Sequence, residues 1–154
     1  MSLPVCVLDA SVGVKWFRDE PGSEESRGLV EEHIAGTLTI VVDTLFCYEV
    51  LRAASRDTEP RDATRIWSDL ARLDLITVPL GEELVAAATD ARADLGCSLY
   101  DAFSAGVASL LGAPLYSADA RAHGAHPGVR LIGRTRSLTK PGQRPDGSRT
   151  STLG

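Results

Sequence analysis

The feature of this sequence that most constrains its fold is the alternation of short β-branched runs with longer helical patterns. The runs with strand character are Val5–Leu8, Leu38–Val42, Leu75–Val78, Leu115–Ser117 and Val129–Ile132. The segments with helical periodicity are Ser23–Ala35, Thr44–Ser55, Arg61–Leu73, Glu82–Leu95 and Leu99–Leu111. This alternation predicts βαβ units, and therefore an α/β three-layer sandwich with a central, mainly parallel sheet of about five strands and helices on both faces.

The last part of the chain differs in composition from the rest. Residues 135–154 are rich in Pro, Gly, Ser and Thr and hold four basic residues against one acidic residue. Such a segment has almost nothing to bury. We expect one folded domain over residues 1–134, followed by a disordered basic tail over residues 135–154.

The folded part of the chain is acidic. Residues 1–134 contain 12 Lys and Arg against 20 Asp and Glu, a formal charge of −8. A domain with this balance lacks the excess of cations that releases counterions from nucleic acid. If the chain handles RNA, metal ions must offset its acids.

Several classes of protein are disfavoured. No apolar stretch approaches the roughly 20 residues that span a bilayer, and the N-terminus MSLPVCVLDAS lacks the pattern of a signal peptide, so we expect a cytoplasmic protein without membrane contact. The three cysteines lie far apart in apolar segments, which favours small buried side chains over disulfides or zinc ligands: Cys6, Cys47 and Cys97.

Two acidic residues follow predicted strands. Asp9 comes directly after the first strand, and Asp119 follows Leu115–Ser117 by two residues. Parallel α/β sheets place ligand sites at the carboxyl ends of their strands. Ser117 is positioned to donate a hydrogen bond to a neighbouring carboxylate. The alternative for each acid is a local cap on the helix that follows.

Glu49 lies on the apolar face of its predicted helix, in the direction of Leu45 and Phe46. Burial of an unpaired carboxylate costs several kcal/mol, so such a residue normally binds a cation, is paired, or is protonated. The alternative to a ligand role is an internal salt bridge with Arg52 or Arg56.

Asp101 stands at the third position of a helix that Ser98 would cap, which matches a capping box. The same helix carries small side chains that allow another element to approach closely. An acid at this position can cap the helix with one oxygen and bind metal with the other. Together, the four acids form an oxygen-only donor set, which suits Mg²⁺ or, in its place, Mn²⁺.

These residues resemble those of a known family. The segments VLDASVGVKWF, YEVLRA and LYDAFSAGVASLLGAPLYSADARAHGAHPGVRLI are similar in order and spacing to the PIN domain, especially the bacterial VapC toxins, over about residues 4 to 133. The resemblance implies a metal site formed by Asp9, Glu49, Asp101 and Asp119, supported by Ser11 and Ser117. One departure is Gly106, in a helix that is usually richer in Ala and Leu, and we expect close helix packing there.

The same resemblance implies an activity and partners. The activity is Mg²⁺-dependent endoribonuclease cleavage by a metal-activated water, leaving 5′-phosphate and 3′-hydroxyl ends. The implied partners are a second copy of the chain and a VapB-like antitoxin whose C-terminal segment occupies the acidic groove, with DNA contacted only through the antitoxin. Four basic residues near the acidic motifs could meet RNA phosphates, although solvated surface charge is the favoured interpretation for each: Lys15, Arg18, Arg52 and Arg121.

Other functions fit the sequence less well or stay open. A haloacid-dehalogenase-like phosphatase needs a second acid two residues after the first, where this chain has Ser11, and a dinucleotide-binding enzyme needs a G-x-G-x-x-G turn, which is absent. The three histidines have no triad or zinc pattern and are predicted to be surface or loop residues: His33, His123 and His126. A catalytically weak PIN-like module that binds RNA or protein stays open.

Overall fold

The computed structural model describes residues 2–134, so the tail predicted for residues 135–154 lies outside the described part of the chain. Its strands are β1 (Val5–Leu8), β2 (Thr39–Asp43), β3 (Ile76–Val78), β4 (Leu115–Ser117) and β5 (Val129–Leu131). Its helices are α1 (Ala10–Gly13), the 3₁₀ helix η1 (Val14–Trp16), α2 (Ser23–Ile34), α3 (Leu45–Ala54), α4 (Asp62–Arg72), α5 (Glu82–Leu95), α6 (Leu99–Leu111) and α7 (Ala120–His123). None of these helices is long and apolar enough to cross a membrane.

The strands form one five-stranded sheet in the order β3-β2-β1-β4-β5, and every neighbouring pair is parallel. The chain moves outward from β1 to β3, then crosses to β4 on the other side of β1. The order therefore reverses between β1 and β4. In open parallel sheets the carboxyl ends of the strands at such a switch point form the usual ligand crevice.

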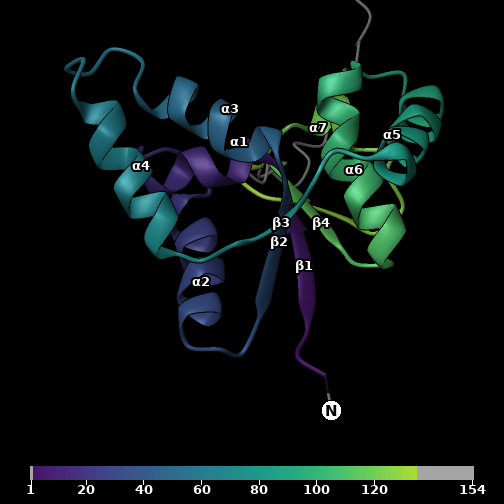
Figure 1. The fold of residues 1–154 in the computed structure, drawn as a ribbon, viewed down its shortest axis with the longest axis horizontal. Helices are drawn as coiled ribbons and strands as arrows, with labels where there is room; N and C mark the ends of the chain where they lie inside the picture. The colour runs from purple at the N-terminus through teal and green to yellow at the C-terminus, as the bar shows by residue number, and fades with distance from the viewer. Residues whose placement is uncertain (1, 135–154) are drawn as a thin grey trace, which may run out of the picture.

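Alternating residues along each strand face two separate cores. Cys6 and Leu8 of β1 pack with buried residues of α1 to α4, while Val7 packs with those of α5 and α6. Figure 1 shows the sheet between these two groups of helices. Because successive side chains of a strand point to opposite faces of the sheet, each face has its own core and its own layer of helices. This arrangement confirms the predicted three-layer α/β sandwich.

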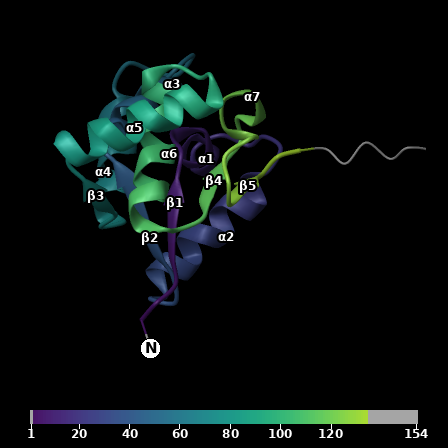
Figure 2. The same cartoon turned by 90° about the vertical axis from the view of Figure 1, so that its right-hand side faces the viewer.

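The strands all point toward one end of the molecule. Figure 2 shows the chain's amino terminus at the opposite end from α3 and α7. Because α1, α3 and α7 begin directly after β1, β2 and β4, their first turns gather at the carboxyl edge of the sheet. Any side chain that caps one of these helices therefore lies at this edge.

The close packing expected at Gly106 is present. A Cβ added there would lie 2.9 Å from the backbone nitrogen of Ala88 and 3.1 Å from its Cα, both on α5. Buried Ala102 and Ala105 share α6 with this glycine. The small residues let α5 and α6 approach with backbone almost in contact, which fixes where α6 begins and thus where Asp101 lies.

Candidate metal centre

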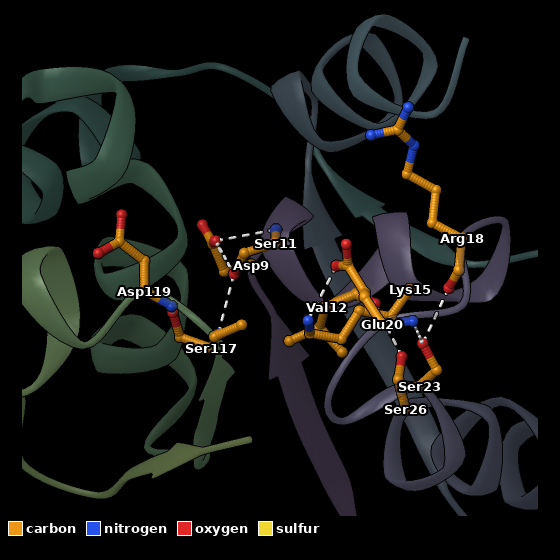
Figure 3. Close-up of polar contacts among 11 residues, drawn as sticks. Asp9, Ser11, Val12, Lys15, Arg18, Glu20, Ser23, Ser26, Ser117 and Asp119 are labelled. Atoms are coloured by element: carbon orange, nitrogen blue, oxygen red, sulfur yellow. Dashed lines mark hydrogen bonds and ion pairs between the residues drawn. The ribbon is translucent and has the colours of Figure 1, made fainter. Parts of the chain in front are cut away.

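Asp9 directly follows β1 at the switch point, and both oxygens of its carboxylate accept hydrogen bonds. Its Oδ2 accepts hydrogen bonds from the backbone nitrogen of Ser11 at 3.0 Å and from Ser11 Oγ at 2.6 Å (Figure 3). Its Oδ1 accepts a bond from Ser104 Oγ on α6 at 3.0 Å. One acid thus joins the end of β1 to the first turn of α1 and to α6, and its orientation is fixed from two sides.

Ser11 links the ends of the two central strands. Besides donating to Asp9, its Oγ accepts a hydrogen bond from the backbone nitrogen of Ala118, just after β4, at 3.0 Å. The backbone nitrogen of Asp9 in turn donates to the carbonyl of Tyr116. The residue predicted to support the site is therefore placed to hold β1 and β4 in register at the crevice.

Asp119 lies two residues beyond β4, the strand that pairs with β1, so it follows its strand at the same edge of the sheet as Asp9 (Figure 3). Its Oδ1 accepts from the backbone nitrogen of Ala122 at 2.9 Å. Asp119 therefore caps α7, which is the alternative to a ligand role that the sequence left open. Ser117 Oγ accepts from the backbone nitrogen of Asp119 at 3.0 Å and lies 2.8 Å from His123 Nδ1. The donation predicted from Ser117 to a carboxylate is wrong, because this hydroxyl is bonded to the histidine.

Ser98 caps α6 as predicted, but the carboxylate of Asp101 bonds to the hydroxyl of Ser98 rather than to its backbone nitrogen, so half of the predicted capping box is present. Ser98 Oγ accepts from the backbone nitrogen of Asp101 at 3.1 Å and donates to its Oδ2 at 2.7 Å. Asp101 and Asp119 line one cleft of about 340 Å³, together with Arg121. Asp101 thus takes part in the cap of α6 and also lines the cleft that it shares with Asp119, as the sequence allowed.

Glu49 is partly buried on α3, and its predicted salt-bridge alternative fails. Of the ion pairs that the structure describes within residues 2–134, none involves Glu49, Arg52 or Arg56. Burial, together with the negative charges of Asp9, Asp43 and Asp101, raises the pKa of Glu49 to about 7. The carboxylates are therefore close enough to repel one another, as a cluster without an internal cation must.

Asp43 is a fifth acid that the sequence interpretation missed. It ends β2, is buried, and its Oδ1 accepts from the backbone nitrogens of Leu45 at 2.7 Å and Phe46 at 3.1 Å, which caps α3. Burial and the charge of Asp9 raise its pKa. The rule that found Asp9, an acid directly after a strand, would also have found Asp43.

The prediction that the histidines are surface or loop residues is wrong for His33 and His123, which lie in α2 and α7, whereas His126 lies in the loop between α7 and β5. His123 is fully buried and His126 is nearly so. His33 is partly buried, and its ring lies 3.3 Å from the carbonyl oxygen of Leu38 and 2.9 Å from that of Leu73. Each imidazole is part of the packed interior or its edge.

The basic residues proposed to meet phosphates divide into two groups. Lys15 is only 6% exposed and pairs with Glu20 at 2.9 Å, so its ammonium group is not available to a phosphate. Arg18 donates to the carbonyl of Arg56 at 2.8 Å. Arg52 and Arg121 are exposed and line clefts with Glu49 and with Asp101, respectively. Only this second pair faces the acids.

The donor set fits a divalent cation by its chemistry. Within residues 2–134 none of the described ion pairs neutralises the predicted ligands, Asp9, Glu49, Asp101 and Asp119. The described side chains do not form a ready-made cage, since no three of the Asp, Glu, His and Cys residues converge on one point. Burial and the charges of the neighbouring acids nevertheless raise the pKa of Glu49 to about 7, and hard cations such as Mg²⁺ supply the positive charge that would relieve this.

Comparison with known proteins identifies the fold and family. A family model of the PIN domain matches residues 6–125. The chain belongs to the PIN domain family. This match confirms the resemblance seen in the sequence. PIN domains typically use a divalent metal, which agrees with the oxygen donors described above.

Solved structures share the PIN fold at low sequence identity. A chain of a toxin–antitoxin complex from Klebsiella pneumoniae is 15% identical with a TM-score of 0.64, over 82% of this chain and 96% of that one. A chain of DNA-bound VapBC from Salmonella typhimurium is 16% identical with a TM-score of 0.62, over 84% and 97%. A chain of FitAcB from Neisseria gonorrhoeae is 16% identical with a TM-score of 0.63, over 80% and 95%. A search among curated proteins finds no match.

Proposed function

We propose that this PIN domain is a Mg²⁺-dependent endoribonuclease and the toxin component of a type II toxin–antitoxin system. The observation that carries the proposal is the set of acids from β2, α3, α6 and the ends of β1 and β4 at one edge of the sheet, where burial, together with the charges of Asp9, Asp43 and Asp101, raises the pKa of Glu49 to about 7. Crowded carboxylates are costly to a fold and are retained where they bind metal. Mn²⁺ would substitute for Mg²⁺ on the same oxygens.

In the proposed reaction Asp9, Glu49, Asp101 and Asp119 hold the metal. When bound, the cation lowers the pKa of a water and neutralises charge on the scissile phosphate. Ser11 and Ser104 fix the two oxygens of Asp9, and Ser98 fixes one oxygen of Asp101. This second layer of hydrogen bonds leaves the carboxylates little freedom to turn away, which lowers the entropy cost of binding.

Two exposed tyrosines favour RNA as the substrate. Tyr48 is 74% exposed and Tyr100 is 67% exposed, and each precedes a proposed metal ligand by one residue. Both line a groove of about 410 Å³ with Glu49 and Arg52. Aromatic faces stack unpaired bases, and an arginine binds a phosphate, so this groove suits a single-stranded segment of RNA.

The proposed partners follow from the family and the charge of the chain. The structural relatives include a toxin–antitoxin complex and a DNA-bound VapBC, so we propose a VapB-like antitoxin and a homodimer. The formal charge of −8 over residues 1–134 disfavours direct binding to DNA, which the antitoxin would contact instead. The proposed location is the cytoplasm.

Cleavage of a labelled RNA pool tests the proposal. The full chain is incubated with Mg²⁺, with Mn²⁺ and with EDTA, beside the variants Asp101→Asn and Asp90→Asn. Asp90 is an exposed acid on α5 and serves as the matched control. We expect metal-dependent cutting that EDTA and Asp101→Asn reduce by about 100-fold or more, and that Asp90→Asn leaves intact. A folded, antitoxin-free wild type that binds Mn²⁺ but cuts none of the RNAs would instead favour the catalytically weak binding module.

A further inference from the structure

His123 is a fully buried polar residue to which the proposed function gives no role. It ends α7, and both of its ring nitrogens have hydrogen-bond partners. Its Nε2 lies 2.7 Å from the carbonyl oxygen of Asp101, and its Nδ1 lies 2.8 Å from Ser117 Oγ. A single ring thus bridges the first turn of α6 and the end of β4.

The partners define the direction of each hydrogen bond. The carbonyl of Asp101 can only accept, so the proton of the neutral ring is on Nε2. Nδ1 is then the acceptor, and Ser117 Oγ donates to it. The hydroxyl of Ser117 keeps its lone pairs for the backbone nitrogen of Asp119, which donates to it at 3.0 Å. The orientation of the Asp119 backbone thereby depends on the imidazole.

A third contact reaches Asp9. Ser104 Oγ lies 3.4 Å from His123 Nε2 and donates to Asp9 Oδ1 at 3.0 Å. Ser104 is itself buried, so water does not replace either partner freely. The imidazole therefore touches the group that orients Asp9, the group that orients Asp119, and the backbone of Asp101.

We propose that His123 is a positioning residue that holds Asp9, Asp101 and Asp119 in the relative placement a divalent cation requires. This inference deepens the proposed function and rests on it. The imidazole suits the task because it is rigid and carries a donor and an acceptor on opposite sides of one ring. Glutamine can replace one of the two bonds, and phenylalanine fills the space but replaces neither.

His33 provides a matched control for a purely structural role. Its ring also bonds through both nitrogens: Nε2 lies 2.9 Å from the carbonyl oxygen of Leu73, and Nδ1 accepts from the backbone nitrogen of Ile40 at 3.2 Å. These partners lie in β2 and at the end of α4 rather than on the acids. Loss of the His33 ring therefore removes comparable hydrogen bonds without touching the cluster.

The first test is direct binding of Mn²⁺ to the purified full chain, measured by calorimetry on wild type, His123→Gln, His123→Phe and His33→Gln. We expect about 10- to 100-fold weaker Mn²⁺ binding for both His123 variants, as is usual when a residue that orients ligands is lost. For His33→Gln we expect a lower melting temperature and unchanged Mn²⁺ affinity. With RNA, His123→Gln should lower kcat at a fixed metal concentration and leave KM unchanged.

The second test uses the metal-free protein and needs no activity. Long-range ¹H–¹⁵N NMR should show His123 as the Nε2-protonated tautomer, and Ser117→Ala should shift its Nδ1 resonance. Ser117→Ala also replaces His123→Phe as the binding variant if the latter does not fold.

The outcomes separate the two proposals. Wild-type Mn²⁺ affinity in folded His123→Gln, or an Nδ1-protonated ring, overturns the positioning role while the nuclease proposal stands. A wild type that binds Mn²⁺ without cutting RNA overturns the nuclease, while the affinity comparison still tests His123. A wild type that binds no Mn²⁺ overturns both.

Discussion

Replacement of Glu49 by glutamine should stabilise the metal-free protein at high pH. Burial and the charges of Asp9, Asp43 and Asp101 raise the pKa of Glu49 from 4.5 to about 7. Because the folded state holds the proton more tightly than the unfolded chain, this group favours folding most below pH 4.5, and that stability is lost as the pH rises through 7. Glutamine carries no charge, so the loss does not occur in Glu49→Gln.

The size of the effect follows from the shift. A rise from 4.5 to about 7 corresponds to about 3 kcal/mol at 1.36 kcal/mol per pH unit, and the partial exposure of Glu49 reduces this to about 1–2 kcal/mol. For a chain of this length the melting temperature at pH 8 should rise by about 3–6 °C, with a much smaller rise at pH 5.

The assay is thermal and urea unfolding in EDTA at pH 5 and pH 8, followed by circular dichroism. Glu31→Gln is the control, because Glu31 is an exposed glutamate in the last turn of α2. Its stability relative to wild type should not depend on pH in this range. If Glu49→Gln gains no more stability at pH 8 than at pH 5, the acids do not repel one another as the structure implies. The argument that this repulsion favours binding of a cation would then fail.

Two further predictions concern the framework of the site. Gly106→Ala should destabilise the protein by about 1–3 kcal/mol in urea unfolding, because the new Cβ would lie 2.9 Å from the backbone nitrogen of Ala88. A stabilised variant would contradict the close approach of α5 and α6. Ser11→Ala should lower the free energy of unfolding by about 1–2 kcal/mol in the same assay. Asp9 loses the hydroxyl that donates to its carboxylate, and the backbone nitrogen of Ala118 loses its acceptor. An unchanged midpoint would show that this link between β1 and β4 contributes nothing to stability.

Most of the fold could be predicted because its signals are local. The strand predicted over Leu38–Val42 spans Thr39–Asp43, and the helix predicted over Glu82–Leu95 has those same bounds. Gly96 follows that helix with a φ of 65°, a conformation that glycine adopts without strain, so the helix end is encoded by one residue. Periodicity and caps of this kind are visible within a few positions of sequence.

The site could be predicted only in part because its hydrogen bonds cross the chain. Asp9 and Asp119 each follow a strand, so a local rule identifies them as candidates. The bond from Ser104 to Asp9 spans 95 residues, and the contact between Ser104 and His123 spans 19. No local pattern marks a serine on the inner face of α6, or a histidine at the end of a four-residue helix, as a partner of these acids.

The same acids that suit the site for metal also work against the fold, and their arrangement explains how the protein tolerates them. Asp9, Asp43 and Asp119 each use an oxygen to cap a helix, and Asp101 accepts from the hydroxyl of Ser98, which caps α6. Each acid therefore helps to stabilise the backbone that brings it close to the others. Glu49 has no such bond among the described residues, and it is the acid whose pKa rises to about 7. The electrostatic cost of the cluster therefore falls mainly on one residue. A cation that binds there stabilises the folded state by mass action, whether it is a metal ion or the basic side chain of a partner. In the proposed toxin, metal and antitoxin would thus compete to neutralise the same excess negative charge around Glu49.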